Sequence, residues 1–260
     1  MSVGQNVLVR AEGAVTHLVL NRPAMMNAFD GGLIREFLEA LSAVEADRNC
    51  RLVLVRGEGR VFQAGADIAE LNRMTPLELL DWNEGIVRIG AGLERLPPPS
   101  IAVMHGAALG GGLELAMACT LRVAEEGCKI GLPEVKLGLI PGAGGTQRLP
   151  RLIGKTRAAW LILSGETISA EQALDLGLVN RVAPPGKGLE VALEMSQRIL
   201  SNAPVAVRMA KDAMEIGLGL PLNEANQYAQ KNCALCFSTE DLKEGTQAFL
   251  DKRAACFKGR

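Results

Sequence analysis

The sequence predicts an α/β protein with an all-helical C-terminal region, and two observations favour this class. In the first 200 or so residues, short β-rich runs alternate with longer runs whose apolar residues recur at helical spacing. From about Ala203, three helical runs follow one another without a strand-like run between them. We therefore expect an α/β core over residues 1–202 and a helical region over residues 203–260.

The α/β core begins with a predicted hairpin and an amphipathic helix. The runs VLVR (Val7–Arg10) and AVTHLVL (Ala14–Leu20) flank a Glu-Gly pair, which is typical of a hairpin. Apolar residues recur with helical period over Gly31–Asp47. Further strands are expected at Arg51–Gly57, Ile101–Gly106 and Leu121–Glu125, and further helices from Asp67, after Pro76 as far as the PPPS run at Pro97–Ser100, and over Gly112–Cys119.

The C-terminal region carries its own helix signals. Pro204 and Pro221 suit the first turns of two of its helices, and Ser238 with Asp241 resembles a capping arrangement for the third. The apolar faces of these helices suit either contacts between subunits or closure of the core.

Composition excludes several classes of protein. Apolar residues make up 48% of the 260 residues and charged residues 22%, which is ordinary for a globular fold. The net charge of −1 and the aromatic content of 3% disfavour a nucleic-acid-binding surface. We see no signal peptide and no apolar run of about 18 residues, so we expect no membrane span and a cytoplasmic location.

Six cysteines are present, and we expect them to be reduced. The pair in CALC, Cys233 and Cys236, is better explained as two small helix residues than as half of a zinc site. A structural zinc ion takes four ligands, and His17 and His105 are the only histidines. The sequence therefore predicts no metal site.

Two glycine-rich turns are the most unusual feature. HGAALGGGLELAMAC (His105–Cys119) places three glycines directly before a helical run, and FQAGADIAEL (Phe62–Leu71) has the same order of strand, glycine turn and helix start. Neither matches a dinucleotide-binding, P-loop or serine-nucleophile motif. Free N–H groups at a helix start favour an anion, including one that forms only during a reaction. One donor from each turn could therefore converge on one carbonyl oxygen as an oxyanion hole.

Two glutamates have apolar neighbours in the sequence. Glu114 is on the helix that Gly110–Gly112 opens, and Glu134 is in GLPEVKLGLIPGAGG (Gly131–Gly145). Apolar surroundings raise the pKa of a carboxyl group, and two neighbouring carboxyls split their pKa values. Taken singly, each is more simply an exposed helix glutamate. Together they suit proton transfer near neutral pH.

Four motifs in this order resemble the crotonase superfamily, and most closely the enoyl-CoA hydratases. They are AGAD, HGAALGGGLELAMAC, GLPEVKLGLIPGAGGTQRLPRLIG and ISAEQALDLGLVNRV, within a similarity that runs from Leu20 to Gly259. The resemblance implies a spiral of ββα turns, with a helical C-terminal region that forms homotrimers, often paired into homohexamers. It implies no cofactor, because CoA is part of the acyl-CoA thioester substrate.

The resemblance also assigns roles to residues. The backbone N–H groups of Ala66 and Gly111 would form the oxyanion hole for the thioester oxygen. Glu114 would deprotonate the water that attacks Cβ, and Glu134 would deliver the proton to Cα. The substrate-binding residues would be Ala64, Asp67, Ile68 and Gly142.

Three departures and three alternatives accompany this assignment. Ala24–Met26 lacks the basic residue common in the family, Thr120 replaces an aspartate, and Lys252–Ala255 reads KRAA. These changes bear on CoA affinity and packing and leave the reacting groups in place.

The alternative functions are a 3,2-enoyl-CoA isomerase or a methylglutaconyl-CoA-type hydratase on the same fold, and an RNA-binding relative. The acyl pocket separates the first two from the leading hypothesis, and we expect Thr75–Leu96 to contribute to it.

Overall fold

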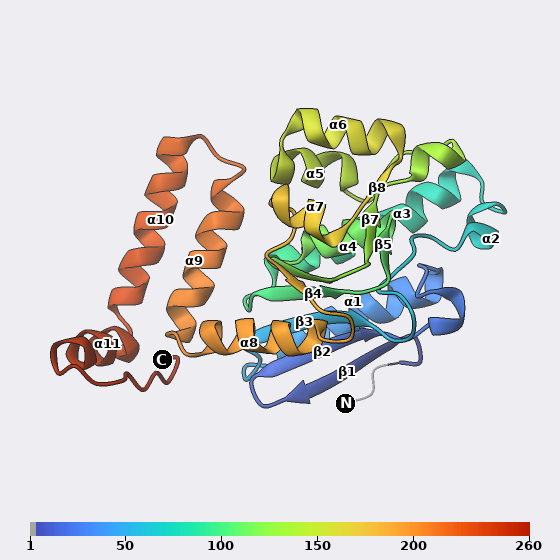
Figure 1. Cartoon of the computed structure of the whole chain (residues 1–260). Coiled ribbons are helices and arrows are strands. Elements are labelled where there is room, and N and C mark those ends of the chain that lie inside the picture. The colour runs from blue at the N-terminus through green and yellow to red at the C-terminus, as the bar shows by residue number, and fades with distance from the viewer. Residues whose placement is uncertain (1–3) are drawn as a thin grey trace. The chain divides into compact units, whose positions relative to one another are not determined.

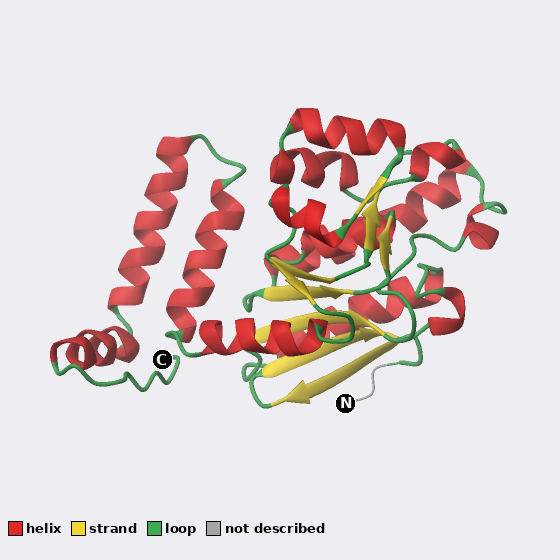
Figure 2. Cartoon of the chain, in the orientation of Figure 1, coloured by secondary structure: helices red, strands yellow, loops and turns green. Residues whose placement is uncertain are grey.

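The computed structural model describes residues 4–260 (Figures 1 and 2). They form two compact units, one containing the chain up to Leu96 together with Ser100–Ala192, and the other Pro97–Pro99 with Leu193–Arg260. The division lies inside helix α8 (Gly188–Leu200), ten residues before the predicted boundary. The strand-free part of the chain begins earlier than expected, because the last strand ends at Ala183.

A six-stranded sheet forms the centre of the first unit, in the order β1-β2-β3-β4-β6-β9. The predicted hairpin is confirmed as the antiparallel pair β1–β2, and the remaining neighbours are parallel. All residues of β2 and β4 are buried, as expected for strands in the middle of a sheet. The strands are β1 (Val7–Glu12), β2 (Val15–Leu20), β3 (Leu52–Gly57), β4 (Ser100–Met104), β6 (Leu121–Glu125) and β9 (Arg181–Ala183).

A second sheet of three short strands was not predicted. It has the order β5 (Ala107–Leu109), β7 (Lys129–Gly131), β8 (Thr167–Ile168). Strands of two or three residues are too short for an alternating pattern to reveal them. This sheet matters for the site, because β5 leads directly into the glycines before α4.

Three helices of the first unit pack in series, α1 (Gly31–Ala46) on α3 (Pro76–Arg95), and α3 on α4 (Gly111–Ala118). Helix α3 begins at a capping box of Thr75 and Glu78 and ends before the proline run. Seven of the eight residues of α4 are buried. The other helices of this unit are the 3-10 turns η1 (Pro23–Met25) and η2 (Glu134–Leu137), with α2 (Ile68–Leu71), α5 (Gly145–Ile153), α6 (Lys155–Ser164) and α7 (Ala170–Asp175).

Thr120, where the resemblance leads us to expect an aspartate, joins the end of α4 to strand β4. Its backbone N–H donates to Oγ of Ser100, and the Ser100 N–H donates to Oγ1 of Thr120, both at 3.1 Å. The hydroxyls of Thr120 and Ser100 therefore each accept the backbone N–H of the other residue.

The three predicted C-terminal helices are confirmed as α9 (Pro204–Gly217), α10 (Leu222–Phe237) and α11 (Glu240–Leu250). Pro204 is the first residue of α9, whereas Pro221 directly precedes α10 as its N-cap residue.

The capping prediction for the third C-terminal helix was wrong by one residue. Thr239 is the cap, because its side chain accepts the N–H of Leu242. Ser238 instead donates to the Leu235 carbonyl, and Asp241 accepts the N–H groups of Lys258 and Gly259, which ties the C-terminal residues to α11.

Cys233 and Cys236 both lie in α10, and all six cysteines are free. Within residues 4–260, the acidic, histidine and cysteine side chains form no group that could hold a metal ion. None of the helices described in that range is long and apolar enough to cross a membrane.

Candidate active site

Short backbone ladders bring the two glycine turns together. The N–H of Gln63 donates to the Ala107 carbonyl, and the N–H of Leu109 donates to the Gln63 carbonyl, at 3.1 and 3.0 Å. On the other side of the Gln63–Ala66 segment, Ala66 forms a parallel β-bridge with Phe29. The segment after β3 is therefore held against β5, immediately before the glycines that open α4.

The backbone at Ala66 and the backbone at Gly111 border one narrow gap. A Cβ atom at Gly65 would lie 3.9 Å from the Gly111 amide nitrogen, and one at Gly111 would lie 3.9 Å from the Gly65 carbonyl carbon. That carbon is bonded to the Ala66 nitrogen. The sharp turns require glycine, because φ is +103° at Gly65 and +53° at Gly110.

The side chain of Gln63 fixes the first turn. Its Oε1 accepts the N–H of Gly65 at 2.6 Å, and its Nε2 donates to the Gly65 carbonyl at 2.9 Å. Gln63 is fully buried, so these two bonds satisfy both ends of its amide. The backbone before Ala66 is thereby held from both sides.

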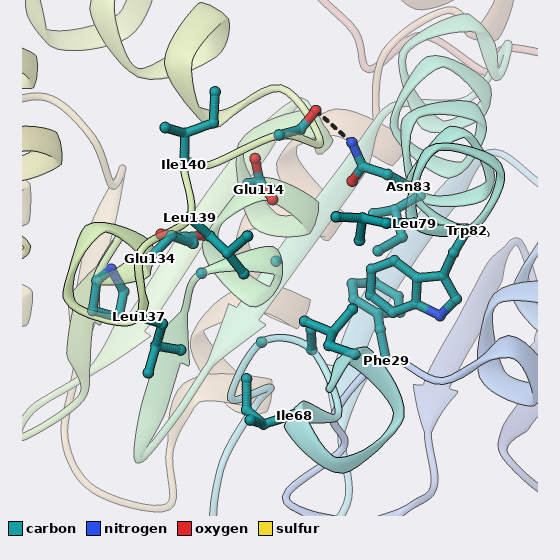
Figure 3. A pocket seen from close by; sticks show the side chains of 18 of the residues that line it. Phe29, Ile68, Leu79, Trp82, Asn83, Glu114, Glu134, Leu137, Leu139 and Ile140 are labelled. Atoms are coloured by element: carbon teal, nitrogen blue, oxygen red, sulfur yellow. Dashed lines mark hydrogen bonds between the residues drawn. The ribbon is translucent and has the colours of Figure 1, made fainter. Parts of the chain in front are cut away.

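The turns open onto a cavity of about 430 Å³ in the first unit (Figure 3). Figure 3 shows the α3 side chains on one side of it and Glu134, Leu139 and Ile140 on the other. Most of the wall is apolar. The lining residues are Phe29, Ala64, Gly65, Ala66, Ile68, Leu71, Leu79, Trp82, Asn83, Ile86, Gly110, Gly111, Glu114, Pro133, Glu134, Leu137, Leu139, Ile140 and Gly142.

Glu114 is buried, with 4% of its surface exposed, and is held by backbone donors. Its Oε1 accepts the N–H groups of Ala143 and Gly145, at 2.8 and 2.7 Å. Burial raises the pKa of Glu114 above its usual value, while these two bonds and the nearby charge of Arg148 oppose the increase. The hydrogen bonds therefore favour the carboxylate form in a place that otherwise disfavours it.

Glu134 is half-buried at the first position of η2 and has a different environment. Its Oε2 is buried without a hydrogen-bond partner in the described part of the chain. Burial raises the pKa of Glu134 to about 7. The hydrogen bond from its own backbone N–H opposes this increase, and the charge of Glu114 adds a smaller contribution to it. At neutral pH this carboxyl is therefore available as a proton donor.

The structure thus brings together all four residues on which the predicted chemistry depends. Ala66, Gly111, Glu114 and Glu134 line one cavity. The Glu134 carboxyl lies directly against the glycine turn, since a Cβ at Gly110 would be 3.0 Å from its Oε1. The expectation that both glutamates sit in apolar surroundings with raised pKa values is confirmed.

Of the four predicted substrate-binding residues, Ala64, Ile68 and Gly142 line the cavity and Asp67 does not. The Asp67 side chain instead accepts the N–H groups of Ala69 and Glu70, which caps α2, and its carboxylate lies 3.5 Å from the guanidinium of Arg22. Its position in the chain places it next to the turn, but its side chain is engaged in holding the local fold.

The residues that hold Glu114 in place were not predicted from the sequence. Thr75–Leu96 was expected to contribute to the acyl pocket, and Leu79, Trp82, Asn83 and Ile86 of α3 do line the cavity. Asn83 was not identified as a polar member of that wall, nor were the amides of Ala143 and Gly145 identified as partners of Glu114. The GAGG run, Gly142–Gly145, contains these amides and was the sequence feature that could have indicated them.

An apolar cavity that holds one buried and one half-buried carboxyl beside paired glycine turns suits proton transfer next to a carbonyl group. The chain belongs to the enoyl-CoA hydratase/isomerase family, whose family model matches residues 10–260.

Individual relatives cover almost the whole chain. It is 39% identical to the short-chain-enoyl-CoA hydratase of Clostridium acetobutylicum over 95% of each protein. It is also 39% identical to the crotonyl-CoA hydratase of Syntrophomonas wolfei, over 97% of this chain and 98% of that protein. The crystal structure of enoyl-CoA hydratase from Bacillus anthracis superposes with a TM-score of 0.95 at 40% identity, over 98% of this chain and all of that one. The predicted crotonase-like fold is confirmed.

Proposed function

We propose that this protein is an enoyl-CoA hydratase. It adds water syn across the 2,3 double bond of a trans-2-enoyl-CoA and releases a 3-hydroxyacyl-CoA. The observation that carries this proposal is the presence in one cavity of two glutamates with unlike surroundings, Glu114 held by two amides and Glu134 with an unpartnered oxygen. Hydration needs both a base for water and an acid for carbon.

The paired turns would stabilise the intermediate. As the nucleophile adds, the π electrons of the double bond move toward the thioester, and negative charge collects on its oxygen. The backbone N–H groups of Ala66 and Gly111 would donate to that oxygen. Fixed backbone donors are effective here because they are oriented before the charge develops.

The two glutamates would divide the proton transfers. Glu114 as carboxylate takes a proton from water while the water oxygen bonds to Cβ. Glu134 as carboxylic acid gives its proton to Cα as the enolate collapses. The cycle leaves Glu114 protonated and Glu134 ionised, and exchange of one proton with solvent restores the starting state.

The cavity walls favour a hydrocarbon acyl chain. Phe29, Leu79 and Trp82 form an apolar surface on the side of the cavity opposite Glu134 (Figure 3), and Ile86 also lines the cavity. Ala64, Ile68 and Gly142 would contact the substrate near the thioester, and Asp67 would act through the α2 turn that it caps. Hydration involves no net oxidation or reduction, so the chemistry requires no redox cofactor, and CoA is the handle of the substrate.

We also propose that the protein is a homotrimer or homohexamer that acts in the cytoplasm. The helical unit exposes large apolar side chains, including Leu218, Leu222 and Phe249, which are 75–84% exposed in the single chain. Exposed apolar surface of this kind is typical of an interface. The free state of all six cysteines is compatible with a reducing compartment. Light scattering on the purified protein would test the oligomer, and a monomer would contradict it.

The activity is tested with purified protein and crotonyl-CoA, by following loss of the enoyl absorbance. The proposal predicts hydration to 3-hydroxybutyryl-CoA. Product analysis on short, medium and branched 2-enoyl-CoAs and on 3-enoyl-CoAs would separate a hydratase from an isomerase or a branched-chain hydratase. Absence of turnover on all 2-enoyl-CoAs would overturn the proposal.

A further inference from the structure

Asn83 on helix α3 is linked to Glu114 through a single peptide group. Its Nδ2 donates to the Gly142 carbonyl at 3.0 Å (dashed line in Figure 3). The N–H of Ala143, which belongs to the same peptide group as that carbonyl, donates to Oε1 of Glu114 at 2.8 Å. The orientation of the Asn83 amide is unambiguous, because a carbonyl oxygen only accepts.

We infer that Asn83 is a positioning residue for Glu114 and acts through the Gly142–Ala143 peptide. A hydrogen bond to the carbonyl of a peptide polarises it and strengthens its N–H as a donor. The same bond fixes the plane of the peptide and hence the direction of the N–H toward Glu114. The inference rests on the proposed function, in which Glu114 has to be ionised and correctly aimed to deprotonate water.

The packing around Gly142 supports a specific contact. A Cβ atom at Gly142 would lie 2.9 Å from Nδ2 of Asn83, so a side chain there would displace the amide. Asn83 and Gly142 both line the cavity. An acyl chain bound beside Asn83 would exclude the water that could otherwise replace its hydrogen bond.

The link is one of two that hold the carboxylate. The N–H of Gly145 also donates to Oε1 of Glu114, at 2.7 Å, and does not depend on Asn83. Loss of Asn83 should therefore weaken Glu114 as a base without abolishing its activity.

The test compares pH profiles of kcat/KM for crotonyl-CoA in variants on both sides of the contact. Asn83→Leu removes the donor at similar size, and Gly142→Ala displaces it. Both should shift the acid limb, which reports ionisation of Glu114, upward by about 0.3–1 pH unit and lower kcat about 3- to 10-fold. Asn83→Gln, which keeps an amide, should restore part of the loss. The alkaline limb should stay in place.

A matched control separates positioning from shaping of the cavity. Ile86→Val changes the same wall one turn along α3 and makes no polar contact with the loop, so it should alter KM and leave the acid limb unmoved. An acid limb that is unchanged in Asn83→Leu and Gly142→Ala, with changes in KM alone, would overturn the inference.

A measurement without turnover keeps the inference separate from the proposed function. If the wild-type protein is inactive on all enoyl-CoAs, the function is wrong, but the link still predicts coupling between Asn83 and Glu114. The urea midpoints of Asn83→Leu, Glu114→Gln and the double variant should then be non-additive. Additive midpoints would show that the two side chains are independent.

Discussion

The two sides of the cavity hold the same residue type in opposite ways. On the α4 side, Glu114 is buried, and one of its oxygens accepts two backbone N–H groups. On the η2 side, Glu134 is less buried, yet one of its oxygens is unpartnered and its pKa is raised to about 7. Hydrogen bonding therefore matters as much as depth of burial in setting the charge of each carboxyl.

The difference suggests how two identical side chains could serve as base and acid. Two carboxyls that interact take up protons as a pair, so their titration belongs to both. With one proton on the pair, the amides of Ala143 and Gly145 favour the charge on Glu114 and leave the proton on Glu134.

Removing either carboxyl should have the largest effect. Glu114→Gln and Glu134→Gln should each lower kcat for crotonyl-CoA by about 10²–10⁴-fold, because each removes one proton-transfer step, and should change KM only a few-fold. The double variant should lose little more than the worse single variant, since the loss of either proton transfer already blocks the same turnover. Stopped-flow hydration assays measure these rates. A single variant with near wild-type kcat would show that its glutamate is not part of the chemistry.

Gly111→Ala should have the next largest effect while leaving both carboxyls in place. A Cβ there would lie 3.1 Å from the ring of the fully buried Phe29. Because that ring has little room to move, we expect the start of α4 to shift and to carry the Gly111 amide with it. We expect kcat/KM to fall about 10²–10³-fold, the usual cost of losing one oxyanion-hole donor. The pH dependence should keep its wild-type form, and a profile altered like that of a glutamate variant would contradict separate roles for the two parts.

A third carboxylate brought in by the substrate should be disfavoured. The charged residues that line the cavity, Glu114 and Glu134, are both acidic, and the rest of the wall is mostly apolar, with Asn83 as a polar member. Desolvation and repulsion should make kcat/KM at least about tenfold lower for a six-carbon 2-enoyl-CoA with a terminal carboxylate than for trans-2-hexenoyl-CoA. Equal turnover of this matched pair would contradict a hydrocarbon-specific cavity and would support the methylglutaconyl-CoA-type alternative, whose substrate carries a second carboxylate.

The smallest expected effect concerns stability. Because the folded state raises the pKa of Glu134 from 4.5 to about 7, this carboxyl contributes stability below pH 4.5, and the contribution is lost as pH rises through 7. Relative to wild type, Glu134→Gln should therefore become more stable between pH 5 and 8, by about 1–3 kcal/mol at the upper end. Urea unfolding at several pH values measures the difference. If the difference in the free energy of unfolding between Glu134→Gln and wild type does not change with pH, the environment of Glu134 does not raise its pKa.

The sequence predicted those parts of the site that depend on local signals. The glycine turns before α4 and α2 need only a few consecutive residues. Glu114 closely follows one of them, and Glu134 lies 20 residues after Glu114 in an apolar run. Even in these segments, the sequence did not predict which way a side chain points. The Asp67 side chain caps α2 and does not line the cavity.

The parts that were missed depend on contacts between distant segments. Asn83 and Gly142 are 59 residues apart and meet only because α3 packs against the loop before α5. The second sheet was missed because its strands are two or three residues long. At the third C-terminal helix, Ser238 and Thr239 are both good caps, and tertiary geometry decides between them.

The pH dependence of kcat/KM for crotonyl-CoA tests most directly whether the glutamate pair acts with a single proton. We predict a bell-shaped profile whose alkaline limb has an apparent pKa of about 7, where Glu134 loses its proton. A rate constant that stays level or continues to rise from pH 7 to pH 9 would contradict the assignment of Glu134 as the acid.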